Sequence, residues 1–495
     1  MSTDTSRMGV SAMAAYVPAL RVQLQDWCEW TGNSWDKIQA VVGSSFRVPG
    51  QHENVYTMAA NAVLRLIRQN DIDPGEIGFL ALGTESSRDN AAGAIIVKGM
   101  IDRALDGLGS PRLSRNAEVP ELKHACLGGI YALKGALRYL ACDARGKKAI
   151  VVAADVAEYE RGSTGEQTQG AGAIAMLVEP RARLFEVDLL HAGTASDYRG
   201  PDFRKPFTRH FIEGYAPNTL RPSDFPIFSG KYSTMSYLDE TVHAVEDMLQ
   251  RLDATDGKFY RQVRGLFFHR PYHLMPVQAM SFLYVRGLAR GRNHHDELAA
   301  LCTEAAVPIE DVFRETASTP DLYESVHRGE TPGDPYEATS RVAGVLRKHR
   351  AFSDLLAEKM SLGSRTMAQM GNLYCAALPM WVAAGLEEAA VTGCDVTGDP
   401  MVMVGYGSGD AADAIPIRAP EGWADVAKRI ALPAALEGGI DLTREQYESI
   451  HDGRDPAYPA YAPSDEFAIS RIGQRYDASF QDLGVEYYEF VAAAS

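Results

Sequence analysis

The alternation of short apolar runs with amphipathic segments is the feature that most constrains the fold of this chain. Between Val55 and Gln69, apolar side chains recur every three or four residues, which predicts a helix with one buried face. The segment DIDPGEIG interrupts this pattern, and Phe79–Leu82 is then predicted to be a buried strand. Four further runs have the length of buried strands: Ala149–Ala154, Ala173–Val178, Gly265–Phe268 and Met401–Val404. Strands separated by helices predict an α/β fold with parallel pairing and both sheet faces covered.

Composition and charge exclude several classes of protein. The chain is 46% apolar and 23% charged, which is typical of a soluble globular protein. It has no run of the roughly 20 apolar residues that a membrane-spanning helix needs. Met1–Tyr16 lacks the continuous apolar core of a secretory signal, so we expect a cytoplasmic protein without a membrane partner. The formal net charge of −16 argues against a broad surface for nucleic acid.

The cysteines form neither a metal-binding nor a disulfide pattern. The six cysteines are Cys28, Cys126, Cys142, Cys302, Cys375 and Cys394. None forms a CxxC pair and none lies at zinc-finger spacing from histidines, so no metal site is predicted. No dinucleotide-binding fingerprint opens the chain, so no redox cofactor is expected.

Cys126 stands directly before a predicted helix. In ELKHACLGGIYALKGALRYLA, the apolar residues after Cys126 follow helical spacing, and Gly128 and Gly129 permit close packing near the helix start. A helix N-terminus stabilises a thiolate and lowers the pKa of a cysteine there, and the thiolate is the form that attacks a thioester. Taken alone, the segment fits a catalytic cysteine and a small buried residue equally well.

Three other chemically capable groups follow predicted strands. Glu85 follows the strand ending at Leu82, His269 follows GLFF, and the glycine-rich sequence GYGSG follows MVMV. Polar residues at strand ends enter the loops where α/β folds build ligand sites. Each has a structural explanation on its own: the glutamate as a solvated or capping residue, the histidine as a packing residue, and GYGSG as a turn without the lysine of a phosphate-binding loop. Their occurrence together with Cys126 favours a catalytic site.

Several segments resemble motifs of the hydroxymethylglutaryl-CoA synthases. These segments are ELKHACLGG, GTESS, FFHRPY, MGNLYCAAL and GYGSG, joined by EQTQGAGAIAMLVEP, YRGPDFRKP and SGKYSTMSYLD. The resemblance extends from about Met8 to Ile415, with two interruptions. Related condensing enzymes share the cysteine but lack the strand that carries the glutamate, so the motifs together are specific to this family.

The resemblance implies a thiolase-like fold, in which two similar α/β halves stack in a five-layer αβαβα arrangement, usually as a homodimer. The N-terminal half carries Glu85 and Cys126, and the C-terminal half carries His269 and Asn372. The implied boundaries are 8–186 for the N-terminal half, 187–453 for the C-terminal half with insertions near 208–228 and 296–359, and 454–495 for a C-terminal extension that packs on the surface.

The resemblance also implies a role for each polar group. Cys126 takes an acetyl group from acetyl-CoA, Glu85 removes a proton from the acetyl methyl, and His269 binds the ketone of acetoacetyl-CoA and protonates the new alkoxide. Water then releases 3-hydroxy-3-methylglutaryl-CoA, in a mevalonate-type pathway of isoprenoid biosynthesis. A carboxylate is a suitable base when burial raises its pKa, and an imidazole donates a proton near neutral pH. Both CoA thioesters are substrates, and no cofactor is implied.

Substrate-binding positions follow from the same resemblance. Asn372 matches the asparagine that holds the acceptor thioester. Backbone N–H groups at Cys126 and at Gly407 and Ser408 would stabilise thioester oxyanions, an effect typically worth about 3 kcal/mol for each donor. Three further residues match positions that line the same pocket: Tyr159, Thr168 and Asp202.

Two residues depart from the family pattern. Leu274 stands five residues after the histidine, where the best-known members have a lysine near the CoA entrance, and Leu127 replaces an aromatic residue after the cysteine. The insertion near 208–228 is expected to reshape the mouth of the pocket. These changes leave the identity of donor and acceptor open.

The sequence is also compatible, to different degrees, with functions other than the CoA-dependent reaction. The same condensation on an acceptor held by an acyl carrier protein, as in polyketide β-branching, suits Leu274, because a phosphopantetheine arm fits while nucleotide contacts weaken. A ketoacyl synthase III-like enzyme uses cysteine, histidine and asparagine without a glutamate base, so Glu85 argues against it. A hydrolase also leaves Glu85 without a role. A non-catalytic scaffold predicts loss of Cys126, Glu85 or His269, and all three are present.

Overall fold

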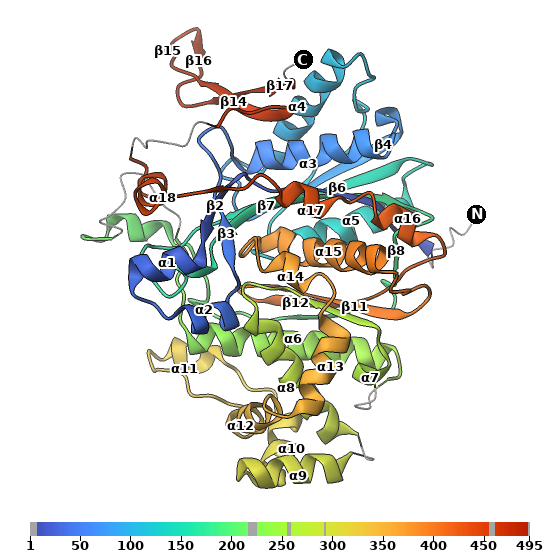
Figure 1. The fold of residues 1–495 in the computed structure, drawn as a ribbon, viewed down its shortest axis with the longest axis vertical. Coiled ribbons are helices and arrows are strands. Elements are labelled where there is room, and N and C mark those ends of the chain that lie inside the picture. The colour runs from blue at the N-terminus through green and yellow to red at the C-terminus, as the bar shows by residue number, and fades with distance from the viewer. Residues whose placement is uncertain (1–6, 216–224, 255–258, 292–293, 455–460, 494–495) are drawn as a thin grey trace.

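Two sheet layers alternate with three layers of helices (Figure 1). The computed structural model describes residues 7–215, 225–254, 259–291, 294–454 and 461–493. One outer layer contains α3 (Val55–Gln69) and α4 (Gly93–Gly107), the central layer α5 (Gly128–Cys142) and α15 (Ala377–Thr392), and the other outer layer α6 (Lys231–Arg251) and α8 (Leu274–Arg290). This arrangement confirms the predicted five-layer αβαβα fold.

Strand β8 joins the two sheet layers into one hydrogen-bonded path. The order along this path is β10 (Gly265–Phe268), β11 (Pro400–Gly407), β12 (Ala411–Arg418), β8 (Phe185–Val187), β1 (Gly9–Tyr16), β7 (Gly170–Glu179), β6 (Lys148–Ala157), β4 (Ile77–Gly83) and β5 (Glu121–Leu122), with β9 (Gly193–Ser196) paired to β12. Phe185 pairs with Val10 of β1, and Val187 pairs with Ile417 of β12. The predicted boundary at 186/187 falls within β8, and the division of the chain into two similar halves stays a prediction.

The apolar patterns of the sequence correspond to helices and strands in the structure. The helix predicted at Val55–Gln69 has these bounds in α3, which begins with a capping box formed by Asn54 and Thr57. The five predicted strands are present as β4, β6, β7, β10 and β11. Parallel pairing is correct for β4 with β6 and for β10 with β11, but wrong for β6 with β7 and for β11 with β12, which are antiparallel. Only residues 408–410 separate β11 from β12, and the link between β6 and β7 contains the 3-10 helix Glu166–Thr168 and no α-helix, so the chain returns in the opposite direction in both pairs.

Helix α15 shows why the central layer is buried on both sides. Of its 16 residues, 13 are buried, and apolar side chains surround the helix instead of occupying one stripe. A helix that is apolar all round belongs inside a large core. Its side chains share one core cluster with α5 and with both sheet layers, so the central helices hold the two sheets together.

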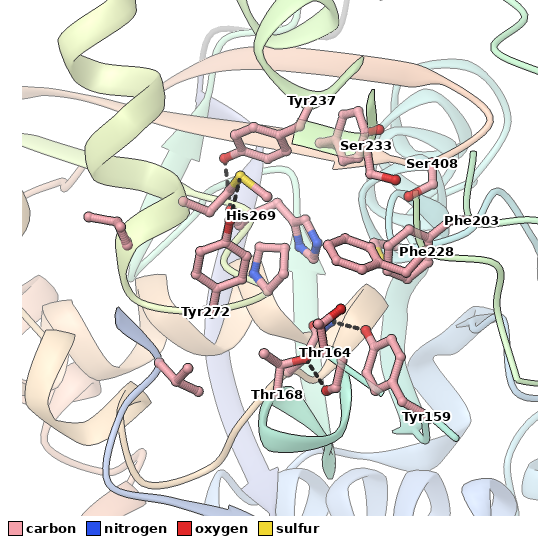
Figure 2. Close-up of a pocket in the computed structure, with 18 of the residues that line it drawn as sticks. Tyr159, Thr164, Thr168, Phe203, Phe228, Ser233, Tyr237, His269, Tyr272 and Ser408 are labelled. Carbon is pink, nitrogen blue, oxygen red and sulfur yellow. Dashed lines mark hydrogen bonds between the residues drawn. The ribbon is translucent and has the colours of Figure 1, made fainter. Parts of the chain in front are cut away.

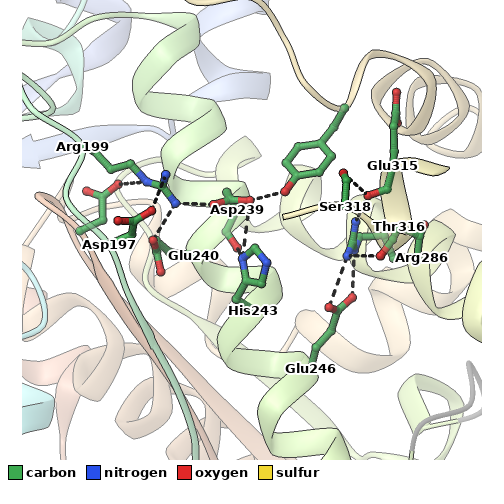
Figure 3. A network of polar contacts seen from close by, with 12 residues as sticks. Asp197, Arg199, Asp239, Glu240, His243, Glu246, Arg286, Glu315, Thr316 and Ser318 are labelled. Atoms are coloured by element: carbon green, nitrogen blue, oxygen red, sulfur yellow. Dashed lines mark hydrogen bonds and ion pairs between the residues drawn. The ribbon is translucent and has the colours of Figure 1, made fainter. Parts of the chain in front are cut away.

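The insertion near 296–359 is helical. It contains α9 (His295–Ala305), α10 (Ile309–Ala317), α11 (Tyr323–His327), α12 (Glu337–Leu346) and α13 (Arg350–Met360). Arg286 of α8 binds it to the body of the protein, donating to Oε1 of Glu246 at 2.9 Å and to the carbonyl of Thr316 at 3.2 Å (Figure 3). In the other insertion, Phe207–Phe211 forms a short 3-10 helix, and residues 216–224 lie outside the described residues.

The remaining elements are short and cover the edges of the layers. They are β2 (Leu20–Gln23), β3 (Ser45–Arg47) and β13 (Ile440–Asp441), which form a small sheet, with α1 (Leu24–Thr31), α2 (Trp35–Val41), α7 (Phe259–Gln262), α14 (Ser364–Met367), α16 (Trp423–Ala427), α17 (Leu432–Leu436) and α18 (Arg444–His451). Within the described ranges, no helix has the length and apolar character required to cross a bilayer.

The C-terminal extension is a pair of hairpins that packs on the surface, as predicted. Its strands are β14 (Glu466–Ile472), β15 (Tyr476–Asp477), β16 (Phe480–Gln481) and β17 (Glu486–Val491). The hairpin of β14 and β17 lies against α3 and α4 (Figure 1). Glu466 accepts a hydrogen bond of 2.7 Å from the Tyr16 hydroxyl, and Phe467 donates its backbone N–H to Asn61 at 2.7 Å.

Glycines at the start of α5 allow this helix to approach the sheet closely. A Cβ atom on Gly129 would lie 2.7 Å from the carbonyl oxygen of Cys375 and 2.9 Å from Cβ of Ala153. Backbone atoms and a strand side chain cannot yield at these distances as the tip of a flexible side chain can. Close packing of the helix therefore requires glycine at Gly128 and Gly129, and this packing fixes the position of the Cys126 thiol.

We expect Gly129→Ala to destabilise the protein, because overpacking of a tight interior typically costs about 1–3 kcal/mol. Urea unfolding followed by circular dichroism measures the change. Gly135→Ala is the matched control: it lies on the same helix, where a Cβ would meet only Phe79 at 3.9 Å, and alanine in a helix is favoured over glycine by about 1 kcal/mol. Equal losses for both variants would contradict the packing argument.

Candidate active site

One cavity is lined by most of the predicted site residues. It has a volume of about 240 Å³. Figure 2 shows the imidazole of His269 in the middle of the lining, with Ser408 on one side and Thr168 on the other. Seven predicted residues form part of the wall: Cys126, Tyr159, Thr168, Asp202, His269, Asn372 and Ser408.

Cys126 lies two residues before α5, where the sequence placed it, and its side chain is buried. Its Sγ is 3.8 Å from Oε2 of Glu85. Burial raises the pKa of the Cys126 thiol well above its ordinary value, and the carboxylates of Glu85 and Asp155 raise this pKa further. The prediction that the helix N-terminus lowers this pKa is wrong for the free protein, because desolvation and two carboxylates act in the opposite direction.

The backbone beside Cys126 adopts an uncommon conformation. Ala125 has a φ of 42° and Tyr374, on a facing loop, has a φ of 43°. The Cys375 thiol donates to the carbonyl oxygen of Ala125 at 2.8 Å, so the two loops are in contact. A left-handed non-glycine residue costs on the order of 1–3 kcal/mol and persists where the surrounding structure enforces it, often at functional sites.

A buried carboxylate, Asp155 of β6, holds the loop that carries Glu85. Its Oδ1 accepts hydrogen bonds from the backbone N–H of Glu85 at 2.9 Å and of Ser86 at 3.0 Å, and from the Thr84 hydroxyl at 2.8 Å. Its Oδ2 accepts from the backbone N–H of Cys375 at 2.9 Å. Burial and the nearby Glu85 carboxylate raise the pKa of Asp155 to about 6. Asp155 is not among the residues predicted from the sequence, although an aspartate inside the apolar run AIVVAADVA is a visible signal.

Lys205 is a second residue of the site that is not predicted from the sequence. Its Nζ lies 3.3 Å from Oε1 of Glu85 and 5.4 Å from the centre of the Tyr374 ring. The segment YRGPDFRKP contains it, but nothing in the sequence indicates that this cation reaches a carboxylate 120 positions earlier.

His269 follows β10, and its ring is fully enclosed. Both ring nitrogens are buried and have no hydrogen-bond partner, whereas its backbone carbonyl accepts from the Tyr237 hydroxyl at 3.0 Å. Burial lowers the pKa of His269 to about 3. The ring is therefore neutral at physiological pH and presents one N–H donor. The expectation that it donates a proton as an imidazolium near neutral pH is not met in the free protein.

The wall beside Cys126 is held by hydrogen bonds between three segments. The Asn372 amide donates to the Tyr159 hydroxyl at 3.3 Å, and its backbone N–H donates to the carbonyl of Thr168 at 3.0 Å. Behind this wall, the imidazole of His451 in α18 lies 2.8 Å from the carbonyl oxygen of Tyr159. Helix α18 thus contributes to the shape of the cavity without lining it.

Most of GYGSG is a strand end, not a loop. Gly405–Gly407 belongs to β11, and only the residues from Ser408 onward form the turn. A Cβ on Gly407 would lie 2.5 Å from the carbonyl oxygen of His124, so this glycine lets β11 pack against the segment before Cys126. Ser408 lines the cavity, and Gly407 lies behind it.

Asp202 belongs to a cluster of buried acids at the far side of the cavity. The Tyr406 hydroxyl lies 3.1 Å from Oδ2 of Asp202 and 3.0 Å from Oδ1 of Asp410. Burial and the Asp202 carboxylate raise the pKa of Asp410 to about 9, so one proton remains on this pair at neutral pH. Arg199 lies behind it, 2.8 Å from Oε1 of Glu240, and also contacts Asp239 and Asp197 (Figure 3).

The two departures from the family pattern fall in different places. Leu274 and Phe228 both line the cavity, so an apolar side chain occupies the lysine position and the insertion near 208–228 reaches the pocket, as expected. Leu127 is buried next to the nucleophile segment, and a Cβ on Gly405 would meet its Cδ1 at 2.6 Å. Its role is packing.

Known proteins resemble this chain over almost its whole length. The sequence model described as hydroxymethylglutaryl-coenzyme A synthase N terminal matches residues 5–183. A hydroxymethylglutaryl-CoA synthase from Haloferax volcanii is 28% identical, covering 90% of this chain and 91% of the relative. Hydroxymethylglutaryl-CoA synthase A from Dictyostelium discoideum is 24% identical, covering 98% and 91%. The solved structure of MvaS in complex with 3-hydroxy-3-methylglutaryl coenzyme A has a TM-score of 0.75 at 26% identity, covering 98% and 99%.

The five layers and the cysteine at the start of a central helix define an enzyme of the thiolase-fold condensing class. Within this class, the curated relatives and the matching family sequence model agree with one another. The chain is therefore similar to the hydroxymethylglutaryl-CoA synthases: residues 5–183 match the N-terminal model of that family, and relatives with this name match almost the whole chain.

The raised pKa of the Cys126 thiol implies slow alkylation of this residue at neutral pH. Because the carboxylate of Glu85 raises this pKa, Glu85→Gln should lower it and increase the alkylation rate at pH 8 several-fold, since one pKa unit changes the thiolate fraction about tenfold. Iodoacetamide labelling of Cys126 between pH 7 and 10, followed by peptide mass spectrometry, measures the shift. Asp36→Asn, which removes an exposed carboxylate of α2, should leave the profile unchanged. A slower reaction in Glu85→Gln would contradict the electrostatic account.

Proposed function

We propose that this enzyme condenses an acetyl group from acetyl-CoA with the ketone of acetoacetyl-CoA to give 3-hydroxy-3-methylglutaryl-CoA. The observation that carries the proposal is the approach of Glu85 Oε2 to within 3.8 Å of Cys126 Sγ at the edge of a cavity that also contains His269. A nucleophile, a base and a neutral hydrogen-bond donor are what an aldol-type condensation of thioesters requires. The similarity to this family supports the same reaction.

The first step is acyl transfer to Cys126. The thiolate attacks the carbonyl carbon of acetyl-CoA, a C–S bond to Cys126 forms, and the C–S bond to CoA breaks. The leaving CoA thiolate takes the proton that Cys126 lost. Backbone N–H groups at Cys126 and at Gly407 and Ser408 are the proposed donors to the oxyanion of the intermediate. The buried thiol opposes this step, so substrate binding has to favour the thiolate.

The second step forms the carbon–carbon bond. Oε2 of Glu85 takes a proton from the acetyl methyl, and the electron pair of the broken C–H bond gives an enolate. The enolate carbon attacks the ketone of the acceptor, whose oxygen accepts a hydrogen bond from neutral His269. The proton held by Glu85 or by the pair of Asp202 and Asp410 is available for the new alkoxide. Hydrolysis of the thioester then frees Cys126.

A second candidate function is the same condensation on an acceptor bound to a carrier protein. Leu274 favours it, because an apolar side chain at the cavity does not offer the charge that a CoA nucleotide would use. A structure described as a curacin-pathway synthase in complex with holo donor carrier protein shares the fold at 19% identity, with a TM-score of 0.68; the carrier protein in that complex is the donor's, not the acceptor's. We further propose a cytoplasmic homodimer acting in a mevalonate-type pathway of isoprenoid biosynthesis.

Intact-protein mass spectrometry tests the order of the steps. With acetyl-CoA alone, the protein should gain one acetyl group, and Cys126→Ala should gain none. Glu85→Ala should still be acetylated but should condense at least about a hundredfold more slowly, since a positioned base typically contributes 10²–10⁴-fold. Normal condensation by Glu85→Ala would refute the proposed base. Discharge of the acetyl-enzyme by acetoacetyl-CoA supports the first function, and discharge only by an acetoacetyl carrier protein supports the second.

Removal of the imidazole tests acceptor binding. His269→Ala should retain acetylation while raising KM for the acceptor and lowering kcat, because the ketone loses its donor. His273→Ala is the matched control, since its ring contacts Arg270 at 3.1 Å and does not line the cavity. Steady-state kinetics give KM for the acceptor and kcat for both variants. Unchanged values in His269→Ala would remove that residue from the mechanism.

A further inference from the structure

The two carboxylate oxygens of Glu85 face different groups. Oε1 lies 3.3 Å from Nζ of Lys205, whereas Oε2 lies 3.8 Å from Sγ of Cys126. The side chain of Glu85 is 9% exposed and that of Lys205 is 25% exposed, so the ion pair lies at the edge of the buried site. Water competes less for such a pair than for one on the open surface.

The orientation of a base depends on both of its oxygens. The Asp155 carboxylate fixes the backbone of Glu85 through its N–H group, but the two methylene groups beyond this point remain free to rotate. An ion pair at one carboxylate oxygen restricts this rotation and thereby sets the direction of the other oxygen. In this site the other oxygen points toward the thiol.

Lys205 is itself held between two segments. Its ammonium lies 5.4 Å from the centre of the Tyr374 ring, a distance typical of a cation–π contact. The backbone N–H of Tyr374 donates to Oδ1 of Asn372 at 2.9 Å, so the ring belongs to the loop that forms the acceptor side of the cavity. The cation therefore connects the Glu85 loop to the Asn372 loop.

The charge of Lys205 also offsets the acids around the nucleophile. Glu85 and Asp155 both disfavour a thiolate at Cys126, and Lys205 favours it. Tyr159, Tyr374 and Cys375 are the other titratable groups around the same pocket, and burial keeps all three protonated near neutral pH. A cation that stays close to the thiol stabilises each anionic species formed on it.

We propose that Lys205 is a positioning residue for the base: its ammonium engages Oε1 of Glu85 so that Oε2 faces the methyl group of the acetyl-cysteine. The inference rests on the proposed function. The acetyl methyl is bonded to the carbonyl carbon that Sγ carries, so an oxygen 3.8 Å from Sγ is within reach of its C–H bonds. When Oε2 takes the proton, the ammonium loses its anionic partner and remains beside the newly formed enolate.

The test separates acyl transfer from deprotonation. Lys205→Met, Lys205→Arg and wild type are incubated with acetyl-CoA in D2O without acceptor. The acetyl adduct on Cys126 and the incorporation of deuterium into the acetyl methyl are followed by mass spectrometry. We expect Lys205→Met to form the adduct, with a slower rate at pH 7, and to lose at least about tenfold more in methyl exchange than in acetylation. Lys205→Arg should recover most of the exchange, because a guanidinium also binds Oε1.

Arg204→Met is the matched control, since it removes an exposed cation one position earlier and should leave both rates unchanged. Methyl exchange at the wild-type rate in Lys205→Met would overturn the proposal. Equal losses of acetylation and exchange, with a lowered melting temperature and no recovery in Lys205→Arg, would also overturn it by assigning Lys205 a structural role. Absence of an acetyl adduct in the wild type would count against the proposed function instead.

Discussion

The hydrogen bonds accepted by the buried carboxylate of Asp155 connect the two sides of the active site. One oxygen binds the loop of Glu85 and the other binds the backbone of Cys375, which in turn contacts the segment before Cys126. Hydrogen bonds to a charged group are worth about 1.5–3 kcal/mol each, more than neutral ones. They offset the cost of burying the carboxylate and of holding Ala125 and Tyr374 in left-handed conformations. Without this contact, loops from distant parts of the chain would have no common anchor.

Burial gives the site a different electrostatic character from that of the same residues in water. It raises the pKa of the Cys126 thiol and lowers that of His269 to about 3, so both groups are neutral in the resting cavity. Glu85 forms an ion pair with Lys205 at the edge of this site. Burial of this kind strengthens the interactions that develop when an anionic intermediate forms, because the surrounding protein screens charge less than bulk water does.

Segments outside the five layers determine the shape of the cavity. The insertion near 208–228 contributes Phe228 to the wall, and α18 supports Tyr159 from behind through His451. The helical insertion is tied to α6 and α8 by Arg286 (Figure 3) and by the hydrogen bond from Tyr336 to Asp239. The layers position the reacting groups, whereas these additions limit what can enter.

The sequence by itself determined the elements and the chemical groups. Apolar periodicity placed α3 and five strands, because the burial of one helix face or of a whole strand leaves a local pattern. The motifs around Glu85, Cys126, His269 and Asn372 indicated the family and predicted the main site residues, three of which, Cys126, His269 and Asn372, line one cavity. Only the tertiary structure revealed the contacts of Asp155 and Lys205, the antiparallel pairing of β6 with β7, and the directions in which the pKa values of Cys126 and His269 move. These contacts, pairings and pKa shifts depend on distances between residues far apart in the chain and on the exclusion of water. A local stretch of sequence determines neither of these quantities.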